Sequence, residues 1–243
     1  MAISSPPRRG GQAASHSQRG LITALVLVLV AVLVLAWVMV ALLARGGSSG
    51  SGVQGSGVAV TQSRVLPAFS SLALAGSNKV TVAVGGRQSV VVHADSNLMH
   101  NVTTRVVAGT LVIGTIGSFT PRSPMSVEVS VPSLAAVELS GSGEISVTGI
   151  DASRLTVTLP GSGALYAGGT VTQLEVTLAG SGLAQLDNLV ARDVHAVVTG
   201  SGLIRVTATA SLNAAVSGSG AIMYSGNPQV TSSITGSGTV TRG

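Results

Sequence analysis

The chain has 243 residues, of which 45% are hydrophobic and 9% charged, and it contains no cysteine. This composition excludes a disulfide framework, thiolate metal ligands and a cysteine nucleophile, and it is too apolar for an intrinsically disordered chain. The net charge of +5 lies in residues 1–64, which hold five arginines and no acid, whereas residues 65–243 hold eight basic and eight acidic residues; this neutral body argues against nucleic-acid binding.

A long apolar segment follows a basic tail at residues 1–20. Residues 21–44 carry no charge and are mostly Leu, Val and Ala. As a helix they would be about 36 Å long, enough to cross a hydrocarbon core of about 30 Å. Three arginines precede the segment and one follows it closely. The positive-inside rule therefore predicts a single-pass anchor in the lipid bilayer of the cell membrane, with a cytoplasmic N-terminus and an extracytoplasmic C-terminal domain.

Two export signals compete with this interpretation. A cleaved signal peptide has an apolar region of only about 7–15 residues and a small-residue cleavage site. The residues Leu42-Leu43-Ala44 fit such a site poorly. The pair Arg8-Arg9 resembles a twin-arginine signal, but the apolar segment begins well after it. The length of that segment favours an uncleaved anchor.

The next segment, residues 45–63, is rich in Gly and Ser and predicts a flexible linker. We expect a folded domain over residues 64–243, with an irregular N-terminal cap and a first coil over 64–132. Within this part, large apolar residues occur at every second position on both sides of Gly76-Ser77-Asn78: Leu72 and Leu74 before it, Val80 and Val82 after it. This pattern predicts the first coil. Ala108-Gly109 separates two short strands and predicts a hairpin turn.

Residues 133–243 predict six regular coils, because they carry a repeat of 18–20 residues. Apolar residues recur six, four and two positions before each Gly-Ser-Gly triplet and four positions after its first glycine, as in Leu155, Val157 and Leu159 before Gly161. This alternation predicts strands with alternate side chains facing one interior. A second corner is marked by Gly or Asn about eight residues after each first glycine, as at Gly149. The sequence therefore predicts an all-β fold, a parallel β-helix or solenoid.

The triplets predict the first corner of each coil. Their glycines are expected to face inward, where a tight corner leaves no room for a Cβ atom. These glycines are Gly141, Gly143, Gly161, Gly163, Gly180, Gly182, Gly200, Gly202, Gly218, Gly220, Gly236 and Gly238. The serines between them are expected to form an outward row about 4.8 Å apart. They are Ser142, Ser162, Ser181, Ser201, Ser219 and Ser237.

One outward column is more polar than the others. Five residues before successive triplets come Glu175, His195 and Asn213, with Thr156 and Thr231 at the two ends. Parallel pairing would place the three central residues side by side. They form either a small binding or acid–base site with His195 as its titrating group, or a solvated strand face with a cross-strand ion pair.

Several linked signatures resemble the head GIN domain family of bacterial proteins, which carries an autotransporter-adhesin label. The resemblance covers residues 64–243 and rests on Arg64-x-Leu66-Pro67-x-Phe69, Ala94-Asp95-x-Asn97-Leu98, Val131-Pro132-x-Leu134 and Tyr224-x-Gly226-x-Pro228 around the serial Gly-Ser-Gly. It implies a right-handed β-helix and a membrane or export signal. The family has no established catalytic residues to carry over.

The sequence shows no pattern for a nucleotide, a metal or a cofactor. Neither a phosphate-binding loop nor the aspartate of calcium-binding β-roll repeats occurs. Cleavage of a polysaccharide would need paired carboxylates on neighbouring coils. Here no two acidic residues stand at the same position of the repeat on adjacent coils. We therefore expect no catalytic residues, no metal ligands and no cofactor.

The expected function is binding, adhesion or envelope scaffolding, with an envelope polymer or a protein as partner and self-association through an open C-terminal edge. The alternative is a polysaccharide-acting enzyme, a hydrolase or lyase, favoured by fold analogy alone. A third option, a ligand sensor, is disfavoured by the short cytoplasmic tail.

Overall fold

The fold is described from a computed structural model of the chain, over residues 52–243. The predicted tail at 1–20, the predicted span at 21–44 and residues 45–51 lie outside the described residues. Within residues 52–243, no helix is both long enough and apolar enough to cross a membrane. These residues form one unit made almost entirely of strands.

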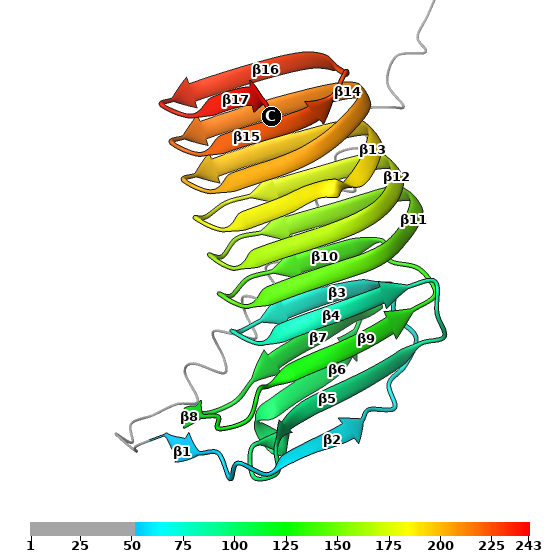
Figure 1. The fold of residues 1–243 in the computed structure, drawn as a ribbon, viewed down its shortest axis with the longest axis vertical. Helices are drawn as coiled ribbons and strands as arrows, with labels where there is room; N and C mark the ends of the chain where they lie inside the picture. The colour runs from blue at the N-terminus through cyan, green and yellow to red at the C-terminus, as the bar shows by residue number, and fades with distance from the viewer. Residues whose placement is uncertain (1–51) are drawn as a thin grey trace, which may run out of the picture. The chain divides into compact units, whose positions relative to one another are not determined.

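Parallel strands stacked in register make up most of this unit (Figure 1). The strands of the regular coils are β10 (Ala136–Leu139), β11 (Glu144–Leu159), β12 (Ala164–Leu178), β13 (Leu183–Gly200), β14 (Leu203–Gly218), β15 (Ala221–Gly226), β16 (Gln229–Gly236) and β17 (Thr239–Arg242). Val157 pairs with Val176, which pairs with Ala196 on the next coil, as the repeat predicts. The prediction of an all-β solenoid is confirmed, with about five turns.

The interior of the solenoid is a continuous column of aliphatic side chains. Leu155, Leu174 and Val194 stack on successive coils and are at most 3% exposed. Because a single coil buries too few side chains to offset the entropy of ordering its backbone, each coil depends on its neighbours for stability.

The second corner differs from the expectation in four coils, whereas in the last coil β15 ends at the predicted Gly226 and β16 begins after it. Strands β11 to β14 run through it as long, bent strands instead of stopping at a turn. The register shifts there, between Val147 and Ile150 on β11 and between Tyr166 and Gly169 on β12. A shift of this kind bends a strand while the ladder on either side continues. The second corner is therefore a bulge within one strand.

At the first corner, backbone stacks directly on backbone. The N–H groups of Ser162 and Gly163 both donate to the carbonyl oxygen of Gly141 on the coil below, at 3.2 and 3.1 Å. The same pattern joins Ser201 and Gly202 to the carbonyl of Gly180. All six serines of the predicted row are exposed.

Both glycines of a triplet are needed for close stacking. A Cβ atom on Gly161 would collide with the Gly141 carbonyl oxygen of the coil below. A Cβ atom on Gly163 would collide with the Gly143 carbonyl oxygen of that coil and would also lie 2.7 Å from the Leu139 side chain inside the solenoid. The second glycine thus leaves room for the interior side chains as well as for the backbone.

The first coil lies beneath the triplet coils, as its frame predicts. Strand β3 (Ser71–Ala75) pairs in parallel with β10, and β4 (Lys79–Val84) pairs in parallel with β11. Leu74 lies beside Leu139, and Val80 beside Ile145. This continuity holds although about fifty residues separate β4 from β10 in the chain.

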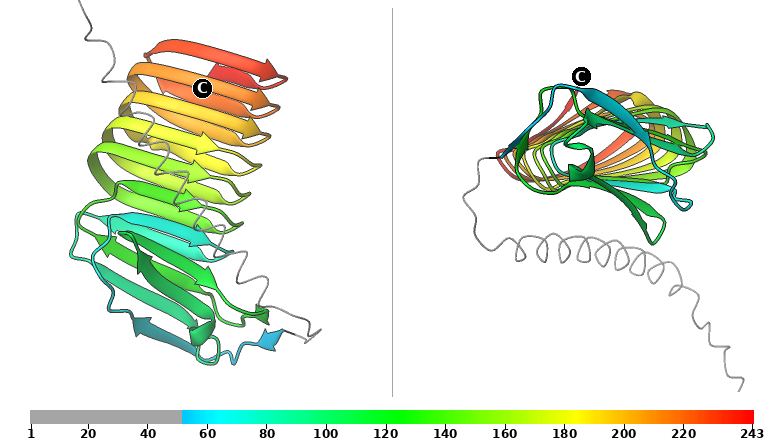
Figure 2. Two further views of the ribbon diagram at one scale, coloured as in Figure 1. Left: turned by 180° about the vertical axis from the view of Figure 1, so that it is seen from behind. Right: turned by 90° about the horizontal axis from the view of Figure 1, so that it is seen from below.

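Those intervening residues form a cap. They contain β5 (Ser89–Asp95), the 3-10 helix η1 (Met99–Asn101), β6 (Val102–Val107), β7 (Thr110–Thr115), β8 (Phe119–Thr120) and β9 (Ser126–Val131). Strands β7 and β9 continue the parallel stack below β3 and β4, and antiparallel strands β6 and β5 then follow them. The predicted hairpin joins β6 to β7, with positive φ at Ala108 and Gly109. Figure 2 shows these strands at one end of the stack.

The flexible linker predicted for 45–63 is wrong over its second half. Residues Val53–Gln54 form β1, which pairs with β8, and Ala59–Ser63 form β2, which pairs antiparallel with β5. The Gly/Ser composition misled the prediction because the groups that order this segment lie about forty residues further along the chain.

Those groups are two side chains of the Ala94-Asp95-x-Asn97-Leu98 signature. The Asn97 side chain accepts a hydrogen bond from the Ser56 N–H and donates one to the Gln54 carbonyl, both at 2.8 Å. The buried Asp95 carboxylate accepts from the N–H groups of Gly57, at 3.0 Å, and Arg122, at 2.7 Å. The signature therefore fastens residues 54–57 to the cap.

The environment of Asp95 favours its ionised form. Burial alone would raise the pKa of its carboxyl, but the backbone N–H groups of Arg122, Ser123 and Gly57 outweigh burial and lower it. The carboxylate is thus a structural acceptor that holds three segments of the cap together.

We expect Gly163→Ala to lower the free energy of unfolding by about 1–3 kcal/mol, because the added methyl group overpacks the corner against the Gly143 carbonyl oxygen and the Leu139 side chain. Ser162→Ala is the matched control, since Ser162 is exposed and its change should stay within about 0.5 kcal/mol. Urea unfolding of both variants measures the difference. Equal midpoints for the two would contradict the stacking argument.

We expect Asp95→Asn to lower the urea midpoint at pH 7, because the amide NH2 group would face backbone donors. Since the native pKa lies below the unfolded value of about 3.9, the stabilisation by ionised Asp95 is fully present above that value and is lost as the pH falls through the native pKa. The difference in urea midpoint between wild type and Asp95→Asn should therefore become smaller at acidic pH.

Asp151→Asn, at an exposed aspartate on β11, is the control and should leave the midpoint at pH 7 unchanged. A midpoint for Asp95→Asn equal to that of wild type at pH 7 would refute a structural role for the carboxylate.

Candidate functional site

The candidate site lies where two outward positions flank one buried position on each strand. On β12 the side chain of Leu174 points into the core, while Gln173 and Glu175 on either side of it point outward. Because the coils stack in register, each outward position becomes a column that runs along the stack.

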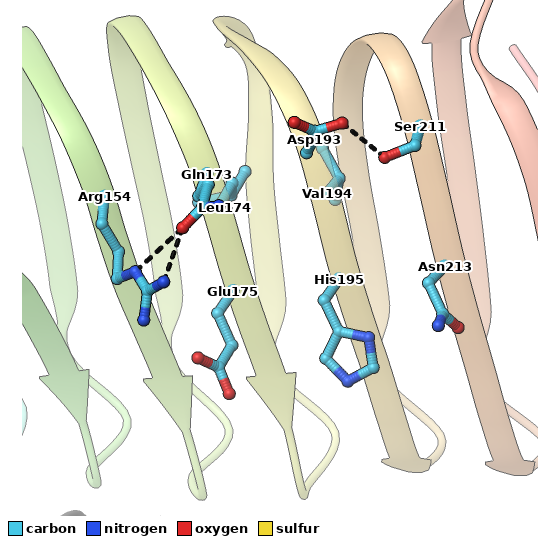
Figure 3. Close-up of a pocket in the computed structure, with 9 residues that line it drawn as sticks. All are labelled: Arg154, Gln173, Leu174, Glu175, Asp193, Val194, His195, Ser211 and Asn213. Atoms are coloured by element: carbon cyan, nitrogen blue, oxygen red, sulfur yellow. Dashed lines mark hydrogen bonds between the residues drawn. The ribbon is translucent and has the colours of Figure 1, made fainter. Parts of the chain in front are cut away.

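The first column contains the residues that the sequence singled out. Glu175 pairs in register with His195, and His195 pairs with Asn213. Figure 3 shows the three side chains side by side on neighbouring strands. No ion pair or hydrogen bond joins Glu175 to His195, so the cross-strand ion pair considered from the sequence is not formed.

The second column was missed at the level of sequence. Arg154, Gln173, Asp193 and Ser211 lie in register, two residues before the first column. Arg154 donates through Nε and Nη2 to the Gln173 side-chain oxygen, at 3.2 and 2.6 Å, and the Ser211 hydroxyl donates to Asp193 at 2.6 Å. The signal was available, because these residues all stand seven positions before a triplet.

Together the two columns line an open groove of about 390 Å³. Its walls are Arg154, Gln173, Leu174, Glu175, Asp193, Val194, His195, Ser211 and Asn213, and so span β11 to β14 (Figure 3). The groove holds one guanidinium and two carboxylates. The three intra-column hydrogen bonds orient Arg154 and Asp193. The side chains of Glu175, His195 and Asn213 make no hydrogen bond with the described residues and keep their polar atoms for a ligand.

The groove suits hydrogen bonding to an extended polar ligand. Its polar groups repeat at the spacing of the strands, about 4.8 Å, along the axis of the stack. Exposed polar groups of this kind bind without the desolvation cost of a buried charge. Across residues 52–243, no cluster of three His, Asp or Glu side chains could hold a metal ion.

Comparisons with known proteins agree with this fold. Residues 68–228 match the family model described as "Putative auto-transporter adhesin, head GIN domain". The match spans more than half of the chain, so the chain belongs to the head GIN domain family. A search of curated proteins finds no match.

Two solved structures are similar to the chain. A "putative adhesin" from Bacteroides fragilis shares 22% sequence identity with a TM-score of 0.68, and the alignment covers 79% of this chain and 100% of that one. A "putative lipid binding protein" from Parabacteroides distasonis also shares 22% identity, with a TM-score of 0.53 and the same coverage. At this identity the likeness concerns the fold alone.

Proposed function

We propose that this head GIN protein is a membrane-anchored extracytoplasmic binding module that holds an envelope polymer or a surface protein in the groove across β11–β14. The observation that carries the proposal is the pair of polar columns in register, one held in place by its own hydrogen bonds and the other, Glu175, His195 and Asn213, with side chains that have no hydrogen-bond partner among the described residues. The adhesin description of the family is in keeping with such a role.

A β-solenoid suits this task for a mechanical reason. Its ladder hydrogen bonds and continuous core hold outward side chains at fixed spacing, so that little entropy is lost when a ligand binds across several coils. Many weak contacts to successive units of one polymer then add through multivalency. The right-handed winding that the family resemblance implies is part of the proposal.

The anchor is the second part of the proposal. It rests on the uncharged residues 21–44 and on the arginine bias around them. Residues 54–57, which follow closely in the chain, are fastened to the cap by Asp95 and Asn97. The solenoid would thus be tethered at its cap end, and the groove on its side would be free to meet a partner.

Catalysis is the alternative, and one observation favours it. The groove contains two carboxylates, Glu175 and Asp193, and glycoside cleavage uses a pair of acids. Against this, Asp193 accepts a hydrogen bond from Ser211, and the groove is open to water. We therefore propose binding without turnover.

A pull-down with fractionated envelope material tests the groove, using the full chain in detergent. Glu175→Ala with His195→Ala should reduce retention roughly tenfold, the effect of losing about 1.4 kcal/mol of binding free energy. The matched control is Thr177→Ala with Thr199→Ala, on the same two strands but outside the groove. Equal retention by the two double variants would contradict the proposed site.

The same material distinguishes binding from cleavage. If the wild-type chain releases soluble fragments over time and Glu175→Gln with Asp193→Asn does not, the alternative function replaces the proposed one.

The absence of cysteine gives a direct test of topology. In intact cells, a membrane-impermeant maleimide should label Ser162→Cys, whereas Ser15→Cys should react only after the cells are permeabilised. Labelling of Ser15→Cys in intact cells would reverse the proposed orientation. Recovery of the chain in the soluble fraction would refute the anchor.

A further inference from the structure

The two ends of the solenoid are finished differently. At the cap end, the parallel stack passes into antiparallel pairs, β5 with β9 and with β2 on one side and β6 with β7 on the other. At the other end, β16 pairs only with β14 and β17 only with β15 among the strands of residues 52–243. Figure 1 shows β16 and β17 as the last layer of the stack. Their outer edges therefore present unpaired backbone donors and acceptors.

The interior is also open at this end. Val230 and Ile234 occupy inward positions, stacked on Leu212 and Val216 of the coil below. Leu212 and Val216 are at most 2% exposed, whereas Val230 and Ile234 are 40% and 45% exposed. The last layer thus exposes apolar side chains to water, whereas the equivalent side chains in the coils beneath it are buried.

Nothing on this edge discourages pairing. Natural edge strands are protected by lysine, proline, bulges or inward-pointing charges. Strand β16, with the sequence QVTSSITG, contains no charge and no proline, and its register with β14 is continuous. Within residues 229–243 the only charged side chain is that of Arg242.

We propose that the occupant of this edge is a second copy of the chain, joined end to end about a two-fold axis with β16 antiparallel to its own equivalent. A two-fold contact is self-complementary and closes, so both open ends are covered at once. The uncharged edge of β16 meets an identical uncharged edge without repulsion. Stacking on the cap of the next copy is disfavoured, because the outermost cap strands β2 and β6 offer edges of only five and six residues, and β6 runs antiparallel to the stack.

The apolar residues set the register. With Ser232 on the two-fold axis, Val230 lies opposite Ile234 of the second copy and Ile234 lies opposite its Val230. These cross-strand pairs close the open interior with the same kind of side chain that fills the coils below. Thr235 would then lie opposite Gln229 of the second copy, about 20 Å from the second copy's Thr235 along the strand. This inference does not depend on the function of the groove.

Cysteine cross-linking tests the arrangement on the full chain, which has no cysteine of its own. Across an antiparallel pair the Cα atoms of Ser232 would be about 4.5–5.5 Å apart, within the range that a disulfide spans. Mild oxidation should therefore give a covalent dimer with Ser232→Cys. Thr235→Cys, on the same strand, and Ser162→Cys, on the side of the stack, should stay monomeric on a non-reducing gel.

The mass of the detergent-solubilised chain gives an independent readout. Wild type should have a protein mass of twice 23.9 kDa, and Ile234→Lys, which points a charge into the interface from an already exposed position, should halve it. A wild-type chain that is monomeric at all concentrations, with no cross-linking of Ser232→Cys, overturns the proposal. Cross-linking of Thr235→Cys alone, or growth into long filaments, overturns the two-fold arrangement. Loss of envelope binding by the groove variants leaves this result unaffected.

Discussion

The close vertical stacking of backbone at the Gly-Ser-Gly corners is the constraint on which the structure depends. At three corners the carbonyl of the first glycine, Gly141, Gly180 or Gly200, accepts two N–H groups from the corner above. This leaves no room for a side chain at the first glycine and little at the second. Because the corners are superposed, the strands between them are also superposed, and a local alternation of apolar residues becomes a continuous core.

The same superposition turns single outward residues into a site. Glu175, His195 and Asn213 are far apart in the chain, yet they lie on adjacent strands because each occupies the same position relative to its triplet. The column of Arg154 and Asp193 joins them to form a groove with charges of both signs.

A stack of parallel strands leaves unpaired backbone groups at each of its two ends. At the N-terminal end the parallel stack gives way to antiparallel pairs that end in the short strands β2 and β6, and the side chains of Asp95 and Asn97 bring residues 54–57 into the cap. At the C-terminal end the edge of β16 carries no such protection. This asymmetry underlies our two proposals, that the chain is attached at the cap end and that it meets a second copy of itself at the other end.

The sequence by itself determined the coil. Side chains alternate between the two faces of a strand, so apolar residues at every second position show which face lies inward. The sequence also identified the triplets, the first coil around Leu72 and Val80, and the column of Glu175 and His195. Only the tertiary structure decided that residues 53–54 and 59–63 are strands, since their partners on β8 and β5 lie far along the chain and Gly/Ser composition carries no trace of them. It likewise decided that the second corner is a bulge and that two outward columns enclose one groove, because both depend on how neighbouring coils meet in space.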